Sequence, residues 1–424
     1  MSASRGRRKF LLTAGGAALA APFVWRRDAR AHTAHIVIIG GGAGGAILAR
    51  TLARSGAGFD IALVEPKARY TTCFFSNRYI TGLQDFDSIT HGYRGLAAGT
   101  GLRVLNQAAT AIDADARTVR LSGGETIGWN RLVVAPGIDF RWDAIEGYGP
   151  EAAKTMPHAW RAGAQSQLLR AQLEAMEDGG TFLIAPPEDP YKCPSGPYER
   201  VSLVAHYFKR EKPKSKIVIL DAKSDFPLQA QFEEGWATHY PGMIEVIPVD
   251  FSGGPKAVDP STMTVMSEDG RFKVAVANII PPQTAGKIAR DAGLADDSGW
   301  CPVDHESFES ALVPGIHVIG DAAVAAPMPK SGYVAGLQAK LCARAILWAL
   351  TGKATDAPLI AGACWSHITP DEAVREYAEF EYVDGAIART LLDISPTGET
   401  EDRRIATAGV AEHWYRDITA EMFG

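Results

Sequence analysis

The sequence contains few cysteines and no paired cysteine motif. Its 424 residues include five cysteines, at positions 73, 193, 301, 342 and 364, and none belongs to a CxxC or CxxCH motif. Structural zinc sites usually take their ligands in closely spaced pairs, so the sequence predicts no metal site. A c-type haem is attached through CxxCH, so any such haem must belong to another chain.

Long apolar runs are also missing beyond the first thirty residues. The run from Phe10 to Val24 is shorter than the roughly 20 residues of a membrane-spanning helix. Arg7-Arg8 precede this run, and Ala29-Arg30-Ala31 follows it as a small-x-small cleavage site. We expect residues 1–31 to be a twin-arginine signal peptide and the mature chain to be periplasmic, without a membrane span. A membrane anchor is the alternative.

An excess of positive charge is the third absence. The whole chain carries a net charge of −6, and removal of residues 1–31, with their seven basic residues and one acidic residue, leaves −12. An acidic surface repels phosphate groups, which argues against nucleic acid as a partner. It suits a basic protein partner or simple solubility, and the charge alone does not choose between them.

A dinucleotide-binding fingerprint follows the first apolar strand. Gly40, Gly42 and Gly45 satisfy G-x-G-x-x-G where the strand from His35 ends and an Ala/Leu-rich helix begins, and Glu65 ends the next strand. The glycines let the backbone turn tightly and approach a pyrophosphate, and the acid accepts hydrogen bonds from a ribose. Together they predict dinucleotide binding.

Downstream segments favour FAD over NAD. Gly320-Asp321 follows another apolar strand and resembles the second FAD motif of flavoproteins with two dinucleotide-binding domains, in which the aspartate holds the ribityl chain. Leu132–Gly137 resembles their intermediate motif. Lys330 lies in the Pro329–Gly332 segment that opens the next helix, and we expect the positive end of this helix to face the flavin pyrimidine.

A second βαβ-like unit lacks the fingerprint. Its strands are Thr181–Ala185 and Lys216–Leu220, and the first is followed by Pro186 and Pro187 where a nicotinamide-dependent reductase would carry glycines. Prolines have no N–H to offer a pyrophosphate. The electron donor or acceptor is therefore not expected to be a nicotinamide.

These units predict an α/β fold with two dinucleotide-binding, Rossmann-like domains of the disulfide-reductase type and a small C-terminal domain. We expect an FAD-binding domain formed by residues 32–150 and 281–355, with a second, NAD-like domain, residues 151–280, inserted between its two parts. Residues 356–424 would form a C-terminal cap or interface domain.

Two cysteines could carry chemistry. Cys193 lies just past the proline loop at the entry to a predicted helix, and a helix N-terminus lowers the pKa of a thiol. Cys364 lies in a Gly-Ala-Cys-Trp segment. From spacing alone, a small core residue is an equally good interpretation of either cysteine.

Several longer segments resemble a single family. They are Tyr70–Asn77, His91-Gly92-Tyr93, Ala185-Pro186-Pro187 with Cys193-Pro194, Lys287-Ile288-Ala289, Gly299–Asp304 and Met328–Tyr333. Over nearly all of the mature chain, the sequence resembles the flavoprotein subunit of flavocytochrome c sulfide dehydrogenase. That family is related to the sulfide:quinone oxidoreductases among the FAD-dependent pyridine nucleotide-disulfide reductase-like flavoproteins.

The resemblance implies a set of roles. Cys73 would be joined to the FAD 8α-methyl group as a thioether, and Cys193 and Cys364 would form a redox disulfide beside the flavin. Sulfide would be oxidised to sulfur or polysulfide, and the electrons would pass to a c-type cytochrome subunit that carries the haem. Cys301 and Cys342 are interpreted as structural thiols.

Some assignments stay open at this point. Glu199, six residues after Cys193, is either a general base for HS⁻ or a solvated helix residue. Trp414-Tyr415 pack over the flavin or in the core. The alternative functions are a sulfide:quinone oxidoreductase, although the C-terminal segment is polar, and a non-catalytic flavin electron-transfer partner.

Overall fold

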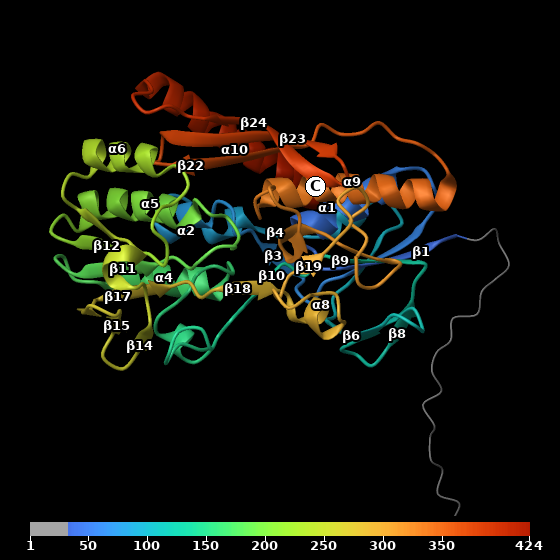
Figure 1. The fold of residues 1–424 in the computed structure, drawn as a ribbon, viewed down its shortest axis with the longest axis horizontal. Helices are drawn as coiled ribbons and strands as arrows, with labels where there is room; N and C mark the ends of the chain where they lie inside the picture. Colours follow the sequence, from blue (N-terminus) through green and yellow to red (C-terminus); the bar gives the residue numbers. More distant parts are fainter. Residues whose placement is uncertain (1–32) are drawn as a thin grey trace, which may run out of the picture.

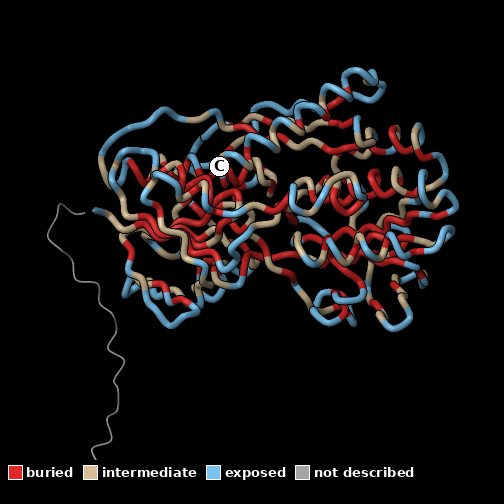
Figure 2. Tube along the Cα trace, turned by 180° about the vertical axis from the view of Figure 1, so that it is seen from behind, coloured by how far each residue is buried: buried red, intermediate tan, exposed pale blue. Residues whose placement is uncertain are grey.

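The structure is a computed structural model that describes residues 33–424. The predicted signal peptide, residues 1–31, lies outside the described residues. Two parallel sheets form two lobes side by side, and the C-terminal elements lie across one side of both (Figure 1). Buried residues concentrate in these sheets and in the helices against them (Figure 2). The predicted α/β fold is confirmed.

The first sheet is built from short apolar strands that are buried on both faces, as expected of a parallel sheet covered by helices. Its five strands have the order β20 (Ile316–Val318), β9 (Arg131–Val134), β1 (His35–Ile39), β2 (Asp60–Val64) and β5 (Arg103–Leu105). Because β20 pairs in parallel with β9, the chain returns to the first sheet after leaving it for the second.

Two long helices pack together beside this sheet. Helix α1 (Ala43–Arg54) follows the glycine turn, and α9 (Gly332–Thr351) packs against it. The Ser331 side chain accepts the N–H of Val334, which caps α9 where the sequence predicts the helix to begin. The positive end of α9 is thereby fixed at the centre of the molecule.

The second sheet repeats the βαβ pattern. Its four parallel strands have the order β13 (Ile244–Ile247), β12 (Lys216–Leu220), β11 (Thr181–Ala185) and β17 (Val276–Ile279). Its helices are α4 (Ala164–Ala175), α5 (Gly196–Glu211) and α6 (Gln229–His239). Helix α4 ends at Ala175, and Gly179, with φ +99°, lies in the turn that leads to β11.

The C-terminal region forms a three-stranded antiparallel sheet and one long helix. The strands are β22 (Ala361–His367), β23 (Ala373–Val383) and β24 (Ala386–Ile394), and the helix is α10 (Glu401–Phe423). Strand β22 packs against α5 and α9, so it touches both lobes. Between residues 33 and 424, no helix combines the length and the apolar character that a membrane crossing needs.

Smaller elements connect these parts. The strands among them are β3 (Arg69–Thr71), β4 (Thr90–Gly92), β6 (Ala109–Asp113), β7 (Thr118–Leu121), β8 (Thr126–Gly128), β10 (Ile138–Phe140), β14 (Ala257–Asp259), β15 (Thr264–Met266), β16 (Arg271–Lys273), β18 (Gln283–Ala285), β19 (Cys301–Pro302) and β21 (Ala323–Val324). The short helices are α2 (Ser76–Ile80), α3 (Arg94–Ala97), α7 (Val249–Ser252) and α8 (Lys287–Asp291), with 3₁₀ turns at Phe86–Ile89, Ala152–Lys154 and Gly320–Ala322.

Candidate active site

The glycine fingerprint forms a turn that no larger residue can replace. Gly40 has φ +100°, and a Cβ on it would lie 2.2 Å from the carbonyl oxygen of Ala135. A Cβ on Gly45 would lie 1.9 Å from the oxygen of Gly40. The turn therefore keeps backbone exposed at the carboxyl end of β1, where a parallel sheet binds its ligand.

Glu65 holds this turn in place. One carboxylate oxygen accepts the N–H of Gly41 at 2.8 Å, and the other accepts the N–H of Lys67 at 3.0 Å. The predicted residues Gly40, Gly42, Glu65 and Asp321 all line one cleft of about 670 Å³. Gly45 lies in the first turn of α1, where the absence of a Cβ lets the helix pack closely on Gly40 and on Ile38 of β1.

Lys330 lies just before α9, in the segment predicted to open that helix. Its ammonium group donates to the carbonyl oxygens of Asp321 at 2.8 Å and Ala323 at 2.9 Å, and lies 3.9 Å from the centre of the Trp300 ring. Burial lowers its pKa to about 8. Its side chain braces the loop that presents Asp321, and it is not among the residues that line the cleft. The start of α9 does border the cleft, through Gly332.

The equivalent position in the second lobe is filled by side chains. Asp221, at the end of β12, is buried and accepts the Tyr198 hydroxyl at 2.5 Å and the Lys223 ammonium at 2.7 Å. Tyr198 stacks on Phe226 with ring centres 3.7 Å apart, and buried Tyr191 lies beside it. Asp221, which corresponds to the ribose-binding acid of the first lobe, is therefore already paired with side chains of its own lobe. This agrees with the absence of a glycine fingerprint after β11.

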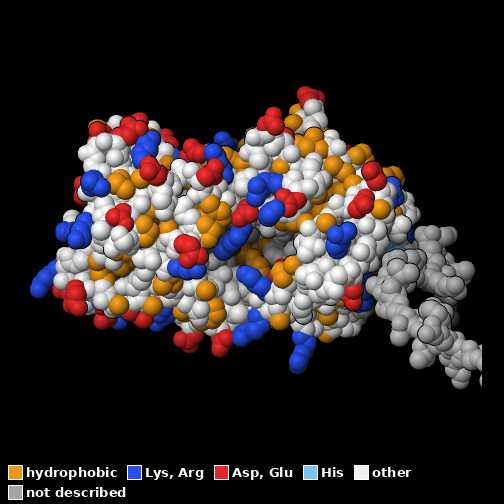
Figure 3. All heavy atoms as spheres, turned by 90° about the horizontal axis from the view of Figure 1, so that it is seen from below, with side chains coloured by type: hydrophobic (Ala, Val, Ile, Leu, Met, Phe, Trp, Pro, Cys, Tyr) orange, Lys and Arg blue, Asp and Glu red, His pale blue; other side chains and the backbone are white. Residues whose placement is uncertain are grey.

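A second cavity, of about 780 Å³, adjoins the dinucleotide cleft. It is lined by Cys73, Cys193, Cys364 and Glu199, and the first two also line the cleft. Figure 3 shows the molecule hollowed between the lobes, with hydrophobic side chains inside and basic side chains nearby. The structure thus brings the three predicted site cysteines, which come from distant parts of the sequence, to two adjoining cavities.

The five cysteines are free thiols in the structure, so the Cys193–Cys364 disulfide expected from the family is not formed there. Its two members nevertheless line the same cavity. Cys301 and Cys342 are buried and have raised pKa values because of that burial, which agrees with structural roles.

Cys73, and not Cys193, is the acidic thiol. The Cys193 thiol donates a hydrogen bond to the Cys73 sulfur, which outweighs burial and, with the charge of Lys192, lowers the pKa of Cys73 to about 6. The same bond, together with burial, raises the pKa of Cys193. The prediction that a helix terminus activates Cys193 is therefore wrong. Helix α5 begins only at Gly196, and Cys193 precedes it with φ +52°.

Lys192 is a site residue that sequence reasoning missed. Its side chain is buried, lines the cysteine cavity, and interacts electrostatically with Cys73, Asp321 and Cys193, which together raise its pKa against the effect of burial. Its backbone is fixed on both sides, because its N–H donates to Gln283 and its carbonyl accepts the Trp160 indole. A lysine beside a cysteine was the available signal.

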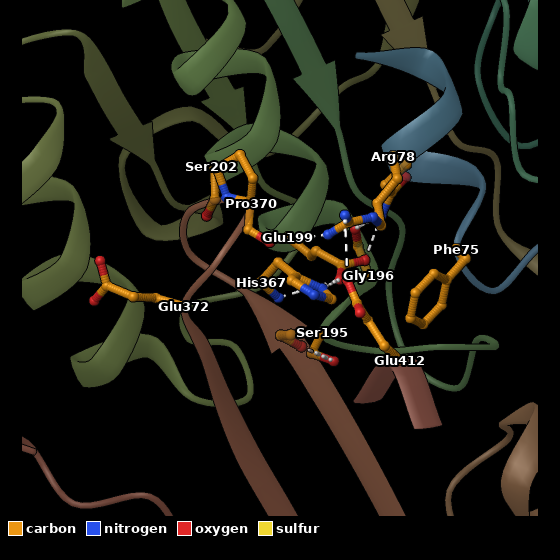
Figure 4. A network of polar contacts seen from close by, with 12 residues as sticks. Phe75, Arg78, Ser195, Gly196, Glu199, Ser202, His367, Pro370, Glu372 and Glu412 are labelled. Carbon is orange, nitrogen blue, oxygen red and sulfur yellow. Dashed lines mark hydrogen bonds and ion pairs between the residues drawn. The ribbon is translucent and has the colours of Figure 1, made fainter. Parts of the chain in front are cut away.

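Glu199 is mostly shielded, with 16% of its side chain exposed, and both of its carboxylate oxygens are hydrogen bonded, so the interpretation of a solvated helix residue is wrong. Its Oε1 accepts the backbone N–H of His367 at 3.1 Å and contacts the Nδ1 of that ring at 3.0 Å (Figure 4). Its Oε2 accepts the Asn77 amide at 2.7 Å. Burial opposes ionisation of Glu199, but these hydrogen bonds outweigh it and lower its pKa. The lowered pKa makes the Glu199 carboxylate a weaker base than an ordinary glutamate.

Asn77, Arg200 and His367 are further residues that the sequence did not reveal. The Arg200 side chain, 1% exposed, donates to Asn77 Oδ1 at 2.9 Å and to Asn278 Oδ1 at 2.7 Å. Asn77 is thereby oriented so that its NH₂ group points to Glu199. The network joins α2, α5 and β22, and no local sequence pattern predicts such a contact.

Aromatic side chains form the other wall of the cavity. Trp414 of α10 contacts Phe74, Tyr333 and Trp365, with ring centres 5.4, 6.3 and 5.5 Å away. All four rings line the cavity. Tyr415 instead stacks on Phe75 at 4.4 Å and contacts the Thr72 hydroxyl at 3.1 Å. Trp414 thus borders the cavity, whereas Tyr415 packs behind it.

Comparison with known proteins places the chain in a family. Residues 166–281 match the model for the central part of the sulfide dehydrogenase [flavocytochrome c] flavoprotein chain, and residues 356–423 match that for the flavocytochrome c sulphide dehydrogenase flavin-binding domain. A curated flavoprotein chain of this dehydrogenase from Chlorobaculum thiosulfatiphilum is 44% identical over 45 residues, which are 94% of that sequence and 11% of this one. The chain belongs to the flavocytochrome c sulfide dehydrogenase flavoprotein family. The family predicted from the sequence is confirmed.

Members of this flavoprotein family share their fold with a wider superfamily. Residues 34–173 match the pyridine nucleotide-disulphide oxidoreductase model. The mitochondrial sulfide:quinone oxidoreductase of mouse is 22% identical over 312 residues, which are 68% of this chain and 65% of that protein. The sulfide:quinone oxidoreductase structure from Aquifex aeolicus superposes with a TM-score of 0.76 at 17% identity and covers 92% of both chains. The disulfide-reductase-type fold is thereby established.

The cleft fits the cofactor of this flavoprotein family. Gly40 and Gly45 leave room at the turn that added Cβ atoms would fill, and Glu65 and Asp321, the acids of the two FAD motifs, both line the cleft. The family's flavin-binding domain covers β22 to α10, and these elements supply Cys364 and Trp414 to the adjoining cavity. Within residues 33–424, no group of three or more His, Cys, Asp or Glu side chains is placed to hold a metal ion.

Proposed function

We propose that this chain is the exported, FAD-dependent, sulfide-oxidising subunit of a sulfide dehydrogenase, and that it passes electrons to a c-type cytochrome. One observation carries the proposal. Cys193 and Cys364 line a single cavity, and Cys193 also borders the dinucleotide cleft. A thiol pair placed between a substrate cavity and a flavin site suits two-electron oxidation of a small sulfur nucleophile.

The reaction starts from the Cys193–Cys364 disulfide. HS⁻ attacks one sulfur and breaks the S–S bond, which leaves a persulfide on one cysteine and a thiolate on the other. The two electrons lost by sulfide then reside on the cysteine pair. FAD, when bound, supplies the two-electron acceptor that can release electrons singly to a haem.

The chain's other residues hold this chemistry in place. Lys192 contributes a buried positive charge beside Cys193, which favours HS⁻ and the thiolate that the attack releases. Glu199 and His367 anchor β22, the strand of Cys364, against α5 through a side-chain contact and a backbone hydrogen bond. We assign Glu199 a positioning role, since both of its oxygens are engaged.

The acceptor is proposed to be a cytochrome because the second lobe offers no nicotinamide site. Asp221, the acid that ends the second strand of that lobe, is buried and already accepts the Tyr198 hydroxyl and the Lys223 ammonium group. The chain itself has no CxxCH, so the haem would belong to the partner subunit.

Replacement of Cys193 tests the function. Cys193→Ser and Cys364→Ser should each abolish sulfide-dependent cytochrome c reduction, and anaerobic sulfide should no longer bleach the flavin. Cys342→Ala, a change at a buried cysteine on α9 that does not line the cavity, is the control and should retain both signals. Unchanged cytochrome reduction in Cys193→Ser would overturn the proposal. Transfer of electrons to a quinone in place of the cytochrome would favour the sulfide:quinone oxidoreductase alternative.

We also propose that the FAD is joined covalently to Cys73, which lines both cavities. Mass spectrometry of the denatured protein should find the flavin mass on the peptide that contains Cys73. Flavin released intact by acid would contradict the linkage but leave sulfide oxidation standing.

Export by the twin-arginine route to the periplasm is the remaining part of the proposal, and it depends on Arg7 and Arg8. Replacement of both by lysine should retain the full-length chain inside the cell, where the signal peptide is not cleaved. Arg26 and Arg27 replaced in the same way are the matched control and should permit export.

A further inference from the structure

Cys73 and Cys193 are in direct contact, a relation that the reaction cycle above does not use. The Cys193 thiol donates a hydrogen bond to the Cys73 sulfur, and the backbone N–H of Phe74 donates to the same sulfur. Both cysteines border the dinucleotide cleft. The contact requires Cys193 to be a thiol, because a disulfide sulfur has no hydrogen to donate.

The surroundings of Cys73 also favour a thiolate. Lys192 attracts the negative charge, whereas burial and Asp321 oppose it. Tyr70 and Tyr415 also lie within electrostatic range of the sulfur, and burial raises the pKa of both phenols, so neither carries charge at neutral pH. The balance lowers the pKa of Cys73, which favours the thiolate that attachment needs.

We propose that Cys193 and Lys192 activate Cys73 for attachment of the flavin, so that attachment precedes formation of the Cys193–Cys364 disulfide. The inference rests on the proposed function. Cys193 thus has two successive roles, first as a hydrogen-bond donor during maturation and later as a redox cysteine. The positive charge of Lys192 likewise stabilises the Cys73 thiolate first and, after attachment, the thiolate released from the Cys193–Cys364 disulfide.

The attachment step balances with an external oxidant. A C–S bond forms between the Cys73 sulfur and the 8α carbon of FAD. The thiol and the methyl group lose one hydrogen each, and these two protons and two electrons reduce the flavin ring. Dioxygen, or the oxidised cytochrome of the proposed function, then removes the two electrons.

The sequence of events agrees with the proposed export route. Twin-arginine substrates leave the cytoplasm folded, and the cytoplasm keeps thiols reduced. A reduced Cys193 is therefore available while the flavin is attached, and the periplasm allows the disulfide to form afterwards.

The test measures covalent flavin rather than turnover. Full-length chain made under flavin limitation is reduced, freed of reductant and incubated with FAD in aerated buffer. The flavin mass on the Cys73 peptide is followed with time at pH 7 and pH 9. Cys193→Ala and Lys192→Met should slow attachment roughly threefold to fivefold at pH 7, because thiolate is lost while the remaining thiolate is more nucleophilic. At pH 9, where the thiolate forms without help, the slowing should be lost, and the variants should attach flavin at least as fast as the wild type because their thiolate is the more nucleophilic.

Conservative variants separate this role from a loss of structure. Cys193→Ser keeps a hydroxyl donor and Lys192→Arg keeps the charge, so both should attach flavin at close to the wild-type rate. Lys209→Met, an exposed lysine on α5, and Cys342→Ala are the matched controls. Normal attachment in Cys193→Ala at pH 7, or equal slowing in Cys193→Ser, would overturn the inference. Absence of covalent flavin in the wild type would instead refute the proposed linkage itself.

Discussion

At the scale of single residues, the site depends on a chain of side chains whose orientations are fixed by hydrogen bonds to one another. Arg200 orients Asn77, Asn77 donates to Glu199, and Glu199 binds His367. A glutamine at position 199 would place an NH₂ group where only acceptors are tolerated, either against the Asn77 amide or against the His367 N–H. Glu199 is therefore required in its ionised form, in which it accepts hydrogen bonds from α2 and from β22 and so joins the two lobes.

We expect Glu199→Gln to lower the free energy of unfolding by about 2 kcal/mol at pH 7, because a buried donor loses its charged acceptor. The pKa of Glu199 is lowered from 4.5 in the folded state, so its contribution is present above pH 4.5 and is lost as the pH falls through the folded pKa. In urea unfolding, the difference in stability between the wild type and Glu199→Gln should therefore be smaller at pH 4 than at pH 7. Glu174→Gln, at an exposed helix ion pair, should change stability by less than about 0.5 kcal/mol at either pH.

The glycine turn permits a second residue-scale prediction. Gly45→Ala would bring a methyl group against the Gly40 carbonyl, so we expect little bound flavin and a loss of about 3 kcal/mol or more of stability. Flavin absorbance per chain and thermal unfolding measure the two effects. Gly58→Ala, in a positive-φ turn with open space around it, should cost about 1 kcal/mol without loss of flavin. Full flavin content in Gly45→Ala would contradict the role assigned to the turn.

Motifs of adjacent residues were predictable, and partners from distant segments were not. Gly40, Glu65 and Asp321 follow buried strands, so pattern alone placed them at one sheet edge. The partners of Glu199 and Cys73 come from other elements, and Lys192 lies in an irregular loop. Their roles arise from packing, which local sequence does not encode.

At the scale of elements, the predicted strands and helices of the two lobes were found because their apolar patterns are strong. Helix α9 begins at Gly332, as expected, and runs to Thr351. The C-terminal sheet was not predicted. Most residues of β24 are exposed on both faces, so the strand lacks the alternation of polar and apolar residues that identifies a half-buried strand.

Helix α10 carries a glycine that nothing in the structure requires. Gly409 is exposed in the helix interior, and a Cβ there would have open space. We expect Gly409→Ala to raise the free energy of unfolding by about 0.5–1 kcal/mol, since alanine loses less backbone entropy in a helix. The reverse change at the exposed Ala406, Ala406→Gly, should lower it by a similar amount. Thermal denaturation of both variants measures the effect, and a destabilised Gly409→Ala would point to a contact made at this position by another molecule.

At the scale of the whole molecule, the mature chain is expected to be strongly acidic, with a net charge of −12 after loss of residues 1–31. Attraction between an acidic flavoprotein and a basic cytochrome accelerates encounter and is screened by salt. We expect the bimolecular rate of reduction of a basic c-type cytochrome to fall about tenfold or more between low and physiological ionic strength. Stopped-flow kinetics measure it, with an acidic cytochrome as the control, for which salt should increase the rate. A rate that is independent of salt would mean that charge does not guide the encounter.

The cavity has a wall on each lobe and a third wall from the end of the chain. Ser195, beside the Cys193 loop, and Ser366 of β22 share a hydrogen bond of 3.0 Å across 171 residues of sequence. The Cys193–Cys364 pair therefore cannot form until translation has passed Cys364 and β22 has docked. An unfinished or truncated chain that reaches an oxidising compartment cannot form the reactive pair, so disulfide formation would itself report that synthesis and folding are complete.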